Sequence, residues 1–222
     1  MLKLFFPHLC CGCDRRLSDG SQVLCVNCQN ELPICFPKNI KDNAFVRQFY
    51  GRLLIESAFT LLRFEKTNLT QRLLHQLKYK GQQQLGVFFG LRMGSMLRQL
   101  KPATHFDLII PVPLSNKRKR KRGYNQVEKF AQSLGQQLNS PVNSKALIRR
   151  DSRHSLVKLG RSSRFKREHH FEVNHKLELS VNMHILLVDD IVTTGATLEA
   201  CAKVLLNKGD FKLSFATIAI SE

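Results

Sequence analysis

Residues 185–197 constrain the fold more than any other stretch of the chain, and they read Ile-Leu-Leu-Val-Asp-Asp-Ile-Val-Thr-Thr-Gly-Ala-Thr. Four consecutive apolar residues are typical of a strand that is buried on both faces of a parallel sheet. Asp189 and Asp190 follow this strand at its C-terminal end, where open α/β sheets bind their ligands. Small and hydroxyl-bearing residues come next and open a helix. The stretch therefore predicts a strand, a ligand-binding loop and a helix at one edge of an α/β sheet.

The predicted loop has the composition of a phosphate-binding loop, with the residues Thr193, Thr194, Gly195, Ala196 and Thr197. Backbone N–H groups at the start of a helix attract anions, a glycine lets the chain approach a phosphate closely, and threonine hydroxyls add donors. Two neighbouring acids would repel a phosphate, unless they accept hydrogen bonds from sugar hydroxyls or hold a divalent cation. A buried strand that ends in a capped turn is the alternative, but capping does not need paired carboxylates.

The charge of the chain indicates a polyanionic partner. The 222 residues carry a formal net charge of +18, and the isoelectric point is about 10.0. Phosphates are the first expectation, and a basic face that is merely solvated is the alternative. No window approaches the roughly 18 apolar residues of a membrane span. The apolar run after Met1 is too short for a signal-peptide core, so we expect a cytoplasmic protein.

Four cysteines near the N-terminus form two Cys-x-x-Cys pairs, Cys10 with Cys13 and Cys25 with Cys28. Such pairs bring four thiolates around one zinc ion, whose binding stabilises a segment that is too small to fold alone. We interpret Cys11, Cys35 and Cys201 as non-ligands. A redox role is the alternative, but no thioredoxin-like pattern surrounds these cysteines. Whether this zinc module also touches nucleic acid is left open.

The apolar spacing along the rest of the chain predicts alternating strands and helices. Lys78 and Lys80 end one of the helices, and we interpret them mainly as compensating the helix dipole, with a phosphate contact as the alternative. The expected helices cover 69–78, 84–100, 127–138 and 196–208, the expected strands cover 106–110, 184–188 and 211–220, and residues 53–64 form a strand-like or mixed hydrophobic segment.

Six consecutive cations occupy residues 117–122, shortly after a predicted strand and the residues Pro111-Val112-Pro113-Leu114. Mutual repulsion predicts a mobile loop here unless an anion neutralises it. An electrostatic clamp for pyrophosphate or for a nucleic-acid backbone is the functional interpretation, and a solvated loop is the alternative. The candidate anion-binding residues are Pro113, Leu114, Arg122 and Gly123.

Residues 145–170 form a second basic segment, with serines and Gly160 that favour a loop. A basic segment of this length inside a compact domain is typically functional or disordered. Its histidines have no spacing that predicts a metal site. The candidate DNA-binding residues of the two basic segments are Lys117, Arg118, Lys119, Arg120, Lys121, Arg122, Arg161, Arg164 and Arg167.

The 185–197 stretch resembles the phosphoribosyl pyrophosphate (PRPP) motif of type I phosphoribosyltransferases. Further motifs occur in order: the four cysteines, Leu-Lys-Tyr-Lys-Gly at 77–81, Pro-Val-Pro-Leu at 111–114 and Arg-Gly-Tyr-Asn-Gln at 122–126. Together they resemble the ComF family of competence-associated, amidophosphoribosyltransferase-like proteins over nearly the whole chain. The resemblance implies an α/β fold with a mostly parallel sheet flanked by helices. It also implies a zinc-ribbon module over 1–36, a connecting segment over 37–66 and a phosphoribosyltransferase-like domain over 67–222.

The resemblance further implies that Asp189 and Asp190 contact the ribose hydroxyls of PRPP bound with Mg²⁺, and that they are the catalytic residues if turnover occurs. The loop 193–197 would hold the 5′-phosphate. The family is associated with uptake of single-stranded DNA in bacteria, so single-stranded DNA and a DNA-uptake or helicase protein are the implied partners. A glutamine and an asparagine that family members commonly carry before the last strands are missing from 153–170.

Three functions are consistent with these features. The first is a PRPP-binding protein that handles single-stranded DNA in DNA uptake. The second is an active phosphoribosyltransferase, in which the protein neutralises the leaving pyrophosphate and excludes water. The third is a zinc-dependent interaction scaffold, which does not need the Asp-Asp-Thr-Gly pattern.

Overall fold

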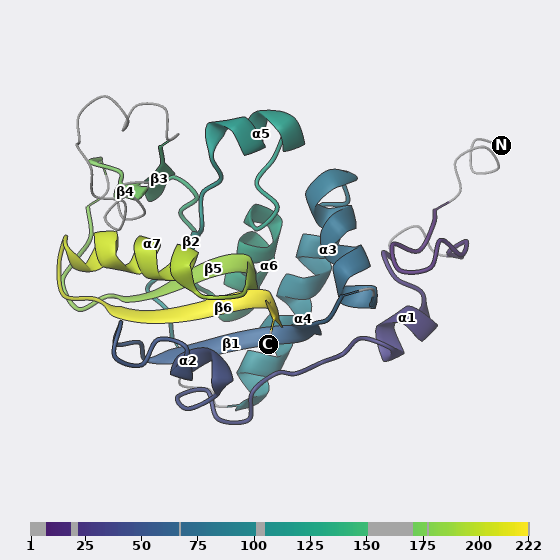
Figure 1. The fold of residues 1–222 in the computed structure, drawn as a ribbon, viewed down its shortest axis with the longest axis horizontal. Helices are drawn as coiled ribbons and strands as arrows, with labels where there is room; N and C mark the ends of the chain where they lie inside the picture. Colours follow the sequence, from purple (N-terminus) through teal and green to yellow (C-terminus); the bar gives the residue numbers. More distant parts are fainter. Residues whose placement is uncertain are drawn as a thin grey trace.

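A four-stranded parallel sheet forms the centre of the computed structural model, which describes residues 8–18, 22–66, 68–100, 105–150, 171–176 and 178–221. The strand order is β1-β6-β5-β2, and each neighbouring pair is parallel. The strands are β1 (Ser57–Phe64), β6 (Lys212–Ser221), β5 (His184–Val192) and β2 (Leu108–Pro111). Figure 1 shows helices on both sides of this sheet, which confirms the predicted fold class.

Two hydrophobic clusters join the helices to the two faces of the sheet. Leu186 and Val188 of β5 point to one face and pack in the cluster that contains α3, α4 and α6. Leu187 and Phe215 point to the other face and pack with α2 and α7, because successive side chains of a strand alternate between faces. The helices of the two layers are α2 (Ala44–Arg47), α3 (Leu69–Tyr79), α4 (Gln84–Leu100), α6 (Glu128–Leu138) and α7 (Ala196–Leu206).

The N-terminal segment packs directly on the main sheet. Cys10 and Cys28 are buried in the same hydrophobic cluster as Leu73 of α3, and the short helix α1 (Val26–Asn30) carries Cys28. The Cys35 N–H donates to the Leu61 carbonyl at 3.0 Å, so the chain that follows the cysteines lies along β1. The predicted connecting segment 37–66 contains both α2 and β1.

The expected loop over Lys117–Arg122 is wrong, because these residues lie in helix α5 (Asn116–Arg122). Ser115 caps the N-terminus by accepting from the Arg118 N–H, and Gly123 ends the helix with a left-handed conformation at φ 78°. None of the side chains of α5 is buried. Exposure to solvent screens the repulsion between neighbouring cations, so a short helix is compatible with six of them.

Two further expectations need correction. β5 was expected to end at Val188, but it continues to Val192 because β6 pairs with it as far as Ile220. The second basic segment was expected to be a loop, but it contains β3 (Leu147–Arg149), which pairs in an antiparallel arrangement with β4 (Phe171–Val173) just after the segment. The candidates Arg161, Arg164 and Arg167 lie outside the described residues.

No described helix combines the length and apolar character that a membrane crossing requires.

Candidate functional site

A cavity of about 170 Å³ lies at the C-terminal edge of β2 and β5. It brings together parts of the chain that the sequence analysis considered separately, namely the paired acids, the Pro-Val-Pro-Leu motif, the basic run and the start of α7. The lining residues are Lys78, Val112, Pro113, Leu114, Arg118, Arg122, Gln126, Arg149, Asp189, Asp190, Ile191 and Thr197. Four cations therefore face two acids, which suits a ligand with several negative charges.

Asp189 and Asp190 project toward opposite faces of β5. Asp190 continues the row of Val188 toward α3 and α6, where Lys78 and Gln126 contact it. Asp189 continues the row of Leu187 toward α7, and its charge adds to burial in raising the pKa of the Cys201 thiol. The acids lie beyond the last pair of β5 with β2, Pro111 with Val188, so one flank of the strand is open beside them.

Both carboxylate oxygens of Asp190 have partners within the protein. Lys78 Nζ lies 3.0 Å from Oδ1, and Gln126 donates to Oδ2 through its side-chain amide. Asp190 is only 4% exposed, so burial strengthens both contacts. A ligand that uses Asp190 has to displace one of these partners or bind beside them.

Asp189 is partly buried and has an unusual pKa. Burial, together with the negative charge of Asp190, raises the pKa of Asp189 to about 7. The Asp190 N–H, which donates to Asp189 Oδ1 at 2.8 Å, and the charges of Lys78 and Arg149 oppose this rise. A carboxyl with such a pKa exchanges its proton near neutral pH, and a bound cation would favour its ionised form.

Arg122 connects the basic helix α5 to the acids. Its Nη1 donates to Gln126 Oε1 at 2.7 Å, and its Nη2 donates to the Tyr79 hydroxyl at 3.2 Å. The guanidinium lies 4.9 Å from the centre of the Tyr79 ring. Since Gln126 also donates to Asp190, its amide bridges a cation of α5 and an acid of β5.

The predicted phosphate loop is supported from behind by the segment that follows α2. Gly195 has φ 74°, and a Cβ atom there would lie 2.6 Å from Cζ of Phe49, so a larger residue does not fit. Arg52 pairs with Glu199 at 2.7 Å and donates to the Thr194 carbonyl at 3.4 Å. In this loop Thr197 lines the cavity, while Thr193 and Thr194 are exposed to solvent.

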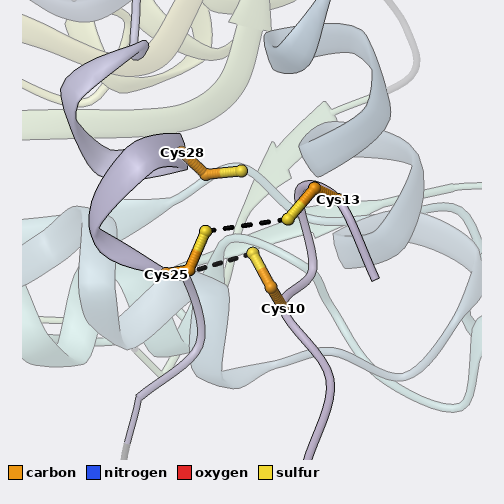
Figure 2. A group of neighbouring side chains, drawn as sticks. All are labelled: Cys10, Cys13, Cys25 and Cys28. Atoms are coloured by element: carbon orange, nitrogen blue, oxygen red, sulfur yellow. Dashed lines mark hydrogen bonds between the residues drawn. The ribbon is translucent and has the colours of Figure 1, made fainter. Parts of the chain in front are cut away.

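The four cysteines of the predicted metal site lie together, as Figure 2 shows. The Sγ atoms of Cys10, Cys13, Cys25 and Cys28 all lie within 4.8 Å of one another, close enough to hold one metal ion. The backbone N–H groups of Cys25 and Gly12 donate to Cys10 Sγ at 3.2 and 3.4 Å. Burial opposes ionisation of Cys10, but these N–H groups lower its pKa to about 7, which favours the thiolate that a metal requires.

Three residues of the cavity were missed by the sequence analysis. The interpretation of Lys78 as a surface residue that compensates the helix dipole is wrong, because α3 ends beside β5 and places Lys78 against Asp190. Gln126 and Arg149 had no assigned role. Lys78 and Gln126 lie within the family motifs at 77–81 and 122–126, and these motifs could have indicated that both residues belong to the site. For Arg149 the sequence offers no indication beyond its charge.

The raised pKa of Asp189 predicts a pH-dependent stability. Between about pH 4 and pH 7, Asp189 keeps its proton in the folded chain but loses it in the unfolded chain. Ionisation of Asp189 therefore opposes folding, and the free energy of unfolding falls as the pH rises through this window. Asp189→Asn removes this effect. We expect the variant to match the parent protein near pH 4 and to unfold at a higher urea concentration at pH 8.

The exposed Asp210→Asn variant controls for the loss of one carboxylate in this experiment. If Asp189→Asn and the parent protein differ in stability to urea by the same amount at pH 4 and at pH 8, the raised pKa does not belong to Asp189.

Comparison with known proteins gives a matching family model and several competence-related relatives. Residues 68–220 match the family model described as phosphoribosyl transferase domain. Competence protein ComFC of Bacillus subtilis is 28% identical over 214 residues, which cover 94% of this chain and 75% of the relative. Competence protein F of Haemophilus influenzae is 26% identical and aligns with 92% of this chain and 93% of its own length.

DNA utilization protein YhgH of Escherichia coli is 31% identical over 141 residues, which cover 62% of this chain and 61% of the relative. The family model spans β5, the loop after it and the motifs that line the cavity. The relatives with competence names align with more than nine tenths of this chain. The chain therefore belongs to the phosphoribosyl transferase domain family, and its competence-related relatives identify it as a member of the ComF group.

Proposed function

We propose that this protein binds PRPP, with Mg²⁺, in the cavity at the edge of β5, and that it binds single-stranded DNA on its basic surface during DNA uptake. One observation carries the first part: a single cavity holds the paired acids, four cations and the start of α7. The acids suit the ribose hydroxyls, and the cations suit the pyrophosphate. The loop 193–197 suits the 5′-phosphate, because it opens α7, where backbone N–H groups and the hydroxyl of Thr197 can donate to an anion.

The donor set fits Mg²⁺, which prefers carboxylate and phosphate oxygens and keeps several waters. Asp189 is a better candidate than Asp190 for a ligand of Mg²⁺, since both carboxylate oxygens of Asp190 already have protein partners. Bound Mg²⁺ would neutralise part of the pyrophosphate charge. Arg118 and Arg122 would neutralise the remainder from α5, and Arg149 would do so from the end of β3.

Phosphoribosyl transfer is a second candidate function for the same cavity. The bond between C1 of the ribose and the pyrophosphate oxygen would break, and an acceptor nucleophile would take the place of pyrophosphate. The cations would stabilise the leaving group, so the protein would act by electrostatic stabilisation rather than by a protein nucleophile. Release of pyrophosphate from PRPP in the presence of candidate bases or amines tests for turnover.

The exposed cations of α5 support the second part of the proposal. Lys117, Lys119 and Arg120 are exposed, and no described residue forms an ion pair with them. Such cations bind nucleic-acid phosphates without sequence preference. The relatives named for competence and DNA utilization favour this partner over other polyanions, and they suggest a DNA-uptake or helicase protein as a further partner.

We also propose a structural zinc ion held by Cys10, Cys13, Cys25 and Cys28. Four thiolates leave no open coordination position, so the metal would stabilise the module rather than catalyse a reaction. The module approaches α3 closely where Gly12 meets Leu69, and the last turn of α3 places Lys78 in the cavity. Zinc would therefore help to hold one wall of the cavity in place.

The PRPP proposal predicts a loss of affinity when the acids or Arg122 are changed. We expect the Kd of PRPP with Mg²⁺ to rise at least tenfold in Asp189→Asn/Asp190→Asn and about tenfold in Arg122→Ala, since a hydrogen bond to a charged group contributes about 1.5–3 kcal/mol. Titration calorimetry measures both. Arg92→Ala, which removes an exposed arginine of α4, should bind like the parent protein. Unchanged affinity in the double aspartate variant would refute the assignment of the site.

The DNA proposal predicts salt-dependent binding of an oligothymidine, measured by fluorescence anisotropy. In Lys117→Ala/Lys119→Ala/Arg120→Ala the slope of log K against log salt should shrink by about two, because each contact to a single strand contributes about 0.7. Lys38→Ala/Lys41→Ala/Arg92→Ala removes the same charge from exposed positions outside α5 and should keep the parent slope. If the slope shrinks equally in the two triple variants, the net charge of the protein, rather than the position of the cations on α5, controls DNA binding.

The zinc proposal predicts one zinc ion per chain by elemental analysis of the dialysed protein. Cys25→Ser should lose this zinc and melt at a lower temperature, because the module shares a hydrophobic cluster with α3. Cys35→Ser should retain the zinc. If Cys25→Ser holds as much zinc as the parent protein, these four cysteines are not the ligands.

A further inference from the structure

Helix α5 has two cationic faces. Arg118 and Arg122 are four residues apart, so they lie on the same side of the helix, and both line the cavity. Lys117, Arg120 and Lys121 follow the i, i+3, i+4 spacing of a different side and are exposed. In Figure 1 the helix stands between β3 and α3, at the edge where the cavity lies. One helix therefore presents cations to the cavity and to the solvent at the same time.

The positive charge of α5 is not balanced by carboxylates. Among the described residues, no cation of α5 forms an ion pair with an acid. Arg122 contacts only neutral groups, the side-chain amide of Gln126 and the phenol of Tyr79. An anion bound on either face of α5 is consequently attracted by all six cations. It also neutralises part of their positive potential, so a second anion on the other face is attracted less strongly.

The dimensions of α5 make this mutual effect strong. A helix of seven residues is about 10 Å long and, with its side chains, about 10–12 Å wide. The Debye length at physiological ionic strength is about 8 Å. Phosphates bound on the two faces are therefore separated by little more than one Debye length, and their repulsion is incompletely screened.

We propose that PRPP in the cavity and single-stranded DNA on the outer face of α5 bind antagonistically, so that PRPP weakens the hold of the protein on DNA. This inference rests on the proposed function, because it requires both ligands to bind. Linkage makes the antagonism reciprocal: DNA weakens PRPP binding by the same factor. The availability of PRPP would then control whether the protein retains or releases a strand.

The size and salt dependence of the effect follow from its electrostatic origin. Coupling between linked sites is commonly about 5–150-fold, and repulsion across a screened distance belongs near the lower end of this range. We expect saturating PRPP with Mg²⁺ to raise the Kd for a labelled oligothymidine about five- to tenfold near physiological salt. At 0.5 M salt the Debye length falls to about 4 Å, and the factor should approach one.

The experiment measures the coupling in both directions. Anisotropy gives the Kd for DNA with and without PRPP, and calorimetry gives the Kd for PRPP with and without DNA. Asp189→Asn/Asp190→Asn, whose affinity for PRPP should be at least tenfold weaker, controls for PRPP acting as a dissolved salt. In this variant the weakening of DNA binding should require PRPP concentrations at least tenfold higher than in the parent protein. Lys117→Gln/Arg120→Gln/Lys121→Gln should weaken DNA binding and reduce the factor by which DNA weakens PRPP binding.

Each outcome separates this inference from the proposed function. If one of the ligands fails to bind at all, the corresponding part of the proposed function is wrong and the inference falls with it. If both bind, but independently or with mutual strengthening, the proposed function stands and the antagonism is refuted. A weakening by PRPP that has the same midpoint concentration in the double aspartate variant as in the parent protein also refutes it, because the effect then does not pass through the cavity.

Discussion

The candidate site depends on the unequal lengths of β5 and its neighbour β2. The last pair of these strands is Pro111 with Val188, whereas β6 supports β5 as far as Val192. Asp189 and Asp190 therefore lie on an extended strand with one flank open beside the Pro-Val-Pro-Leu motif. The alternation of a strand then sends the two acids to opposite faces, so Lys78 pairs with Asp190, while Asp189 feels Lys78 and Arg149 only through their charges.

The distribution of charge in the cavity explains why two acids can serve a site for an anion. Lys78 and Gln126 already occupy the oxygens of Asp190, and burial together with the charge of Asp190 raises the pKa of Asp189 to about 7. The effective negative charge is consequently small, while Arg118, Arg122 and Arg149 remain near the cavity. Part of the excess positive charge of the chain thus lies at the edge of the sheet where a phosphorylated ligand would bind.

Helix α3 links the two ends of the protein. Its buried face belongs to the same hydrophobic cluster as Cys10 and Cys28, and a Cβ atom on Gly12 would lie 2.9 Å from Leu69, so the contact is close. Its C-terminal turn supplies Lys78 and Tyr79 to the cavity and to α5. The cysteine segment and the basic helix consequently both contact α3, although the sequence shows them as separate motifs.

Local patterns in the sequence were sufficient for the fold class, the four-cysteine cluster and the existence of most helices and strands, because apolar periodicity and short-range spacing determine these features. They were insufficient wherever distant residues meet. The contact of Lys78 with Asp190, the bridge through Gln126 and the approach of Arg149 join separate segments, and no local pattern encodes such contacts.

The basic run illustrates the same limit. Its composition predicted a loop, whereas the cap at Ser115, the turn at Gly123 and contacts with Tyr79 make it a helix, since tertiary contacts and capping outweigh a local repulsion that solvent screens.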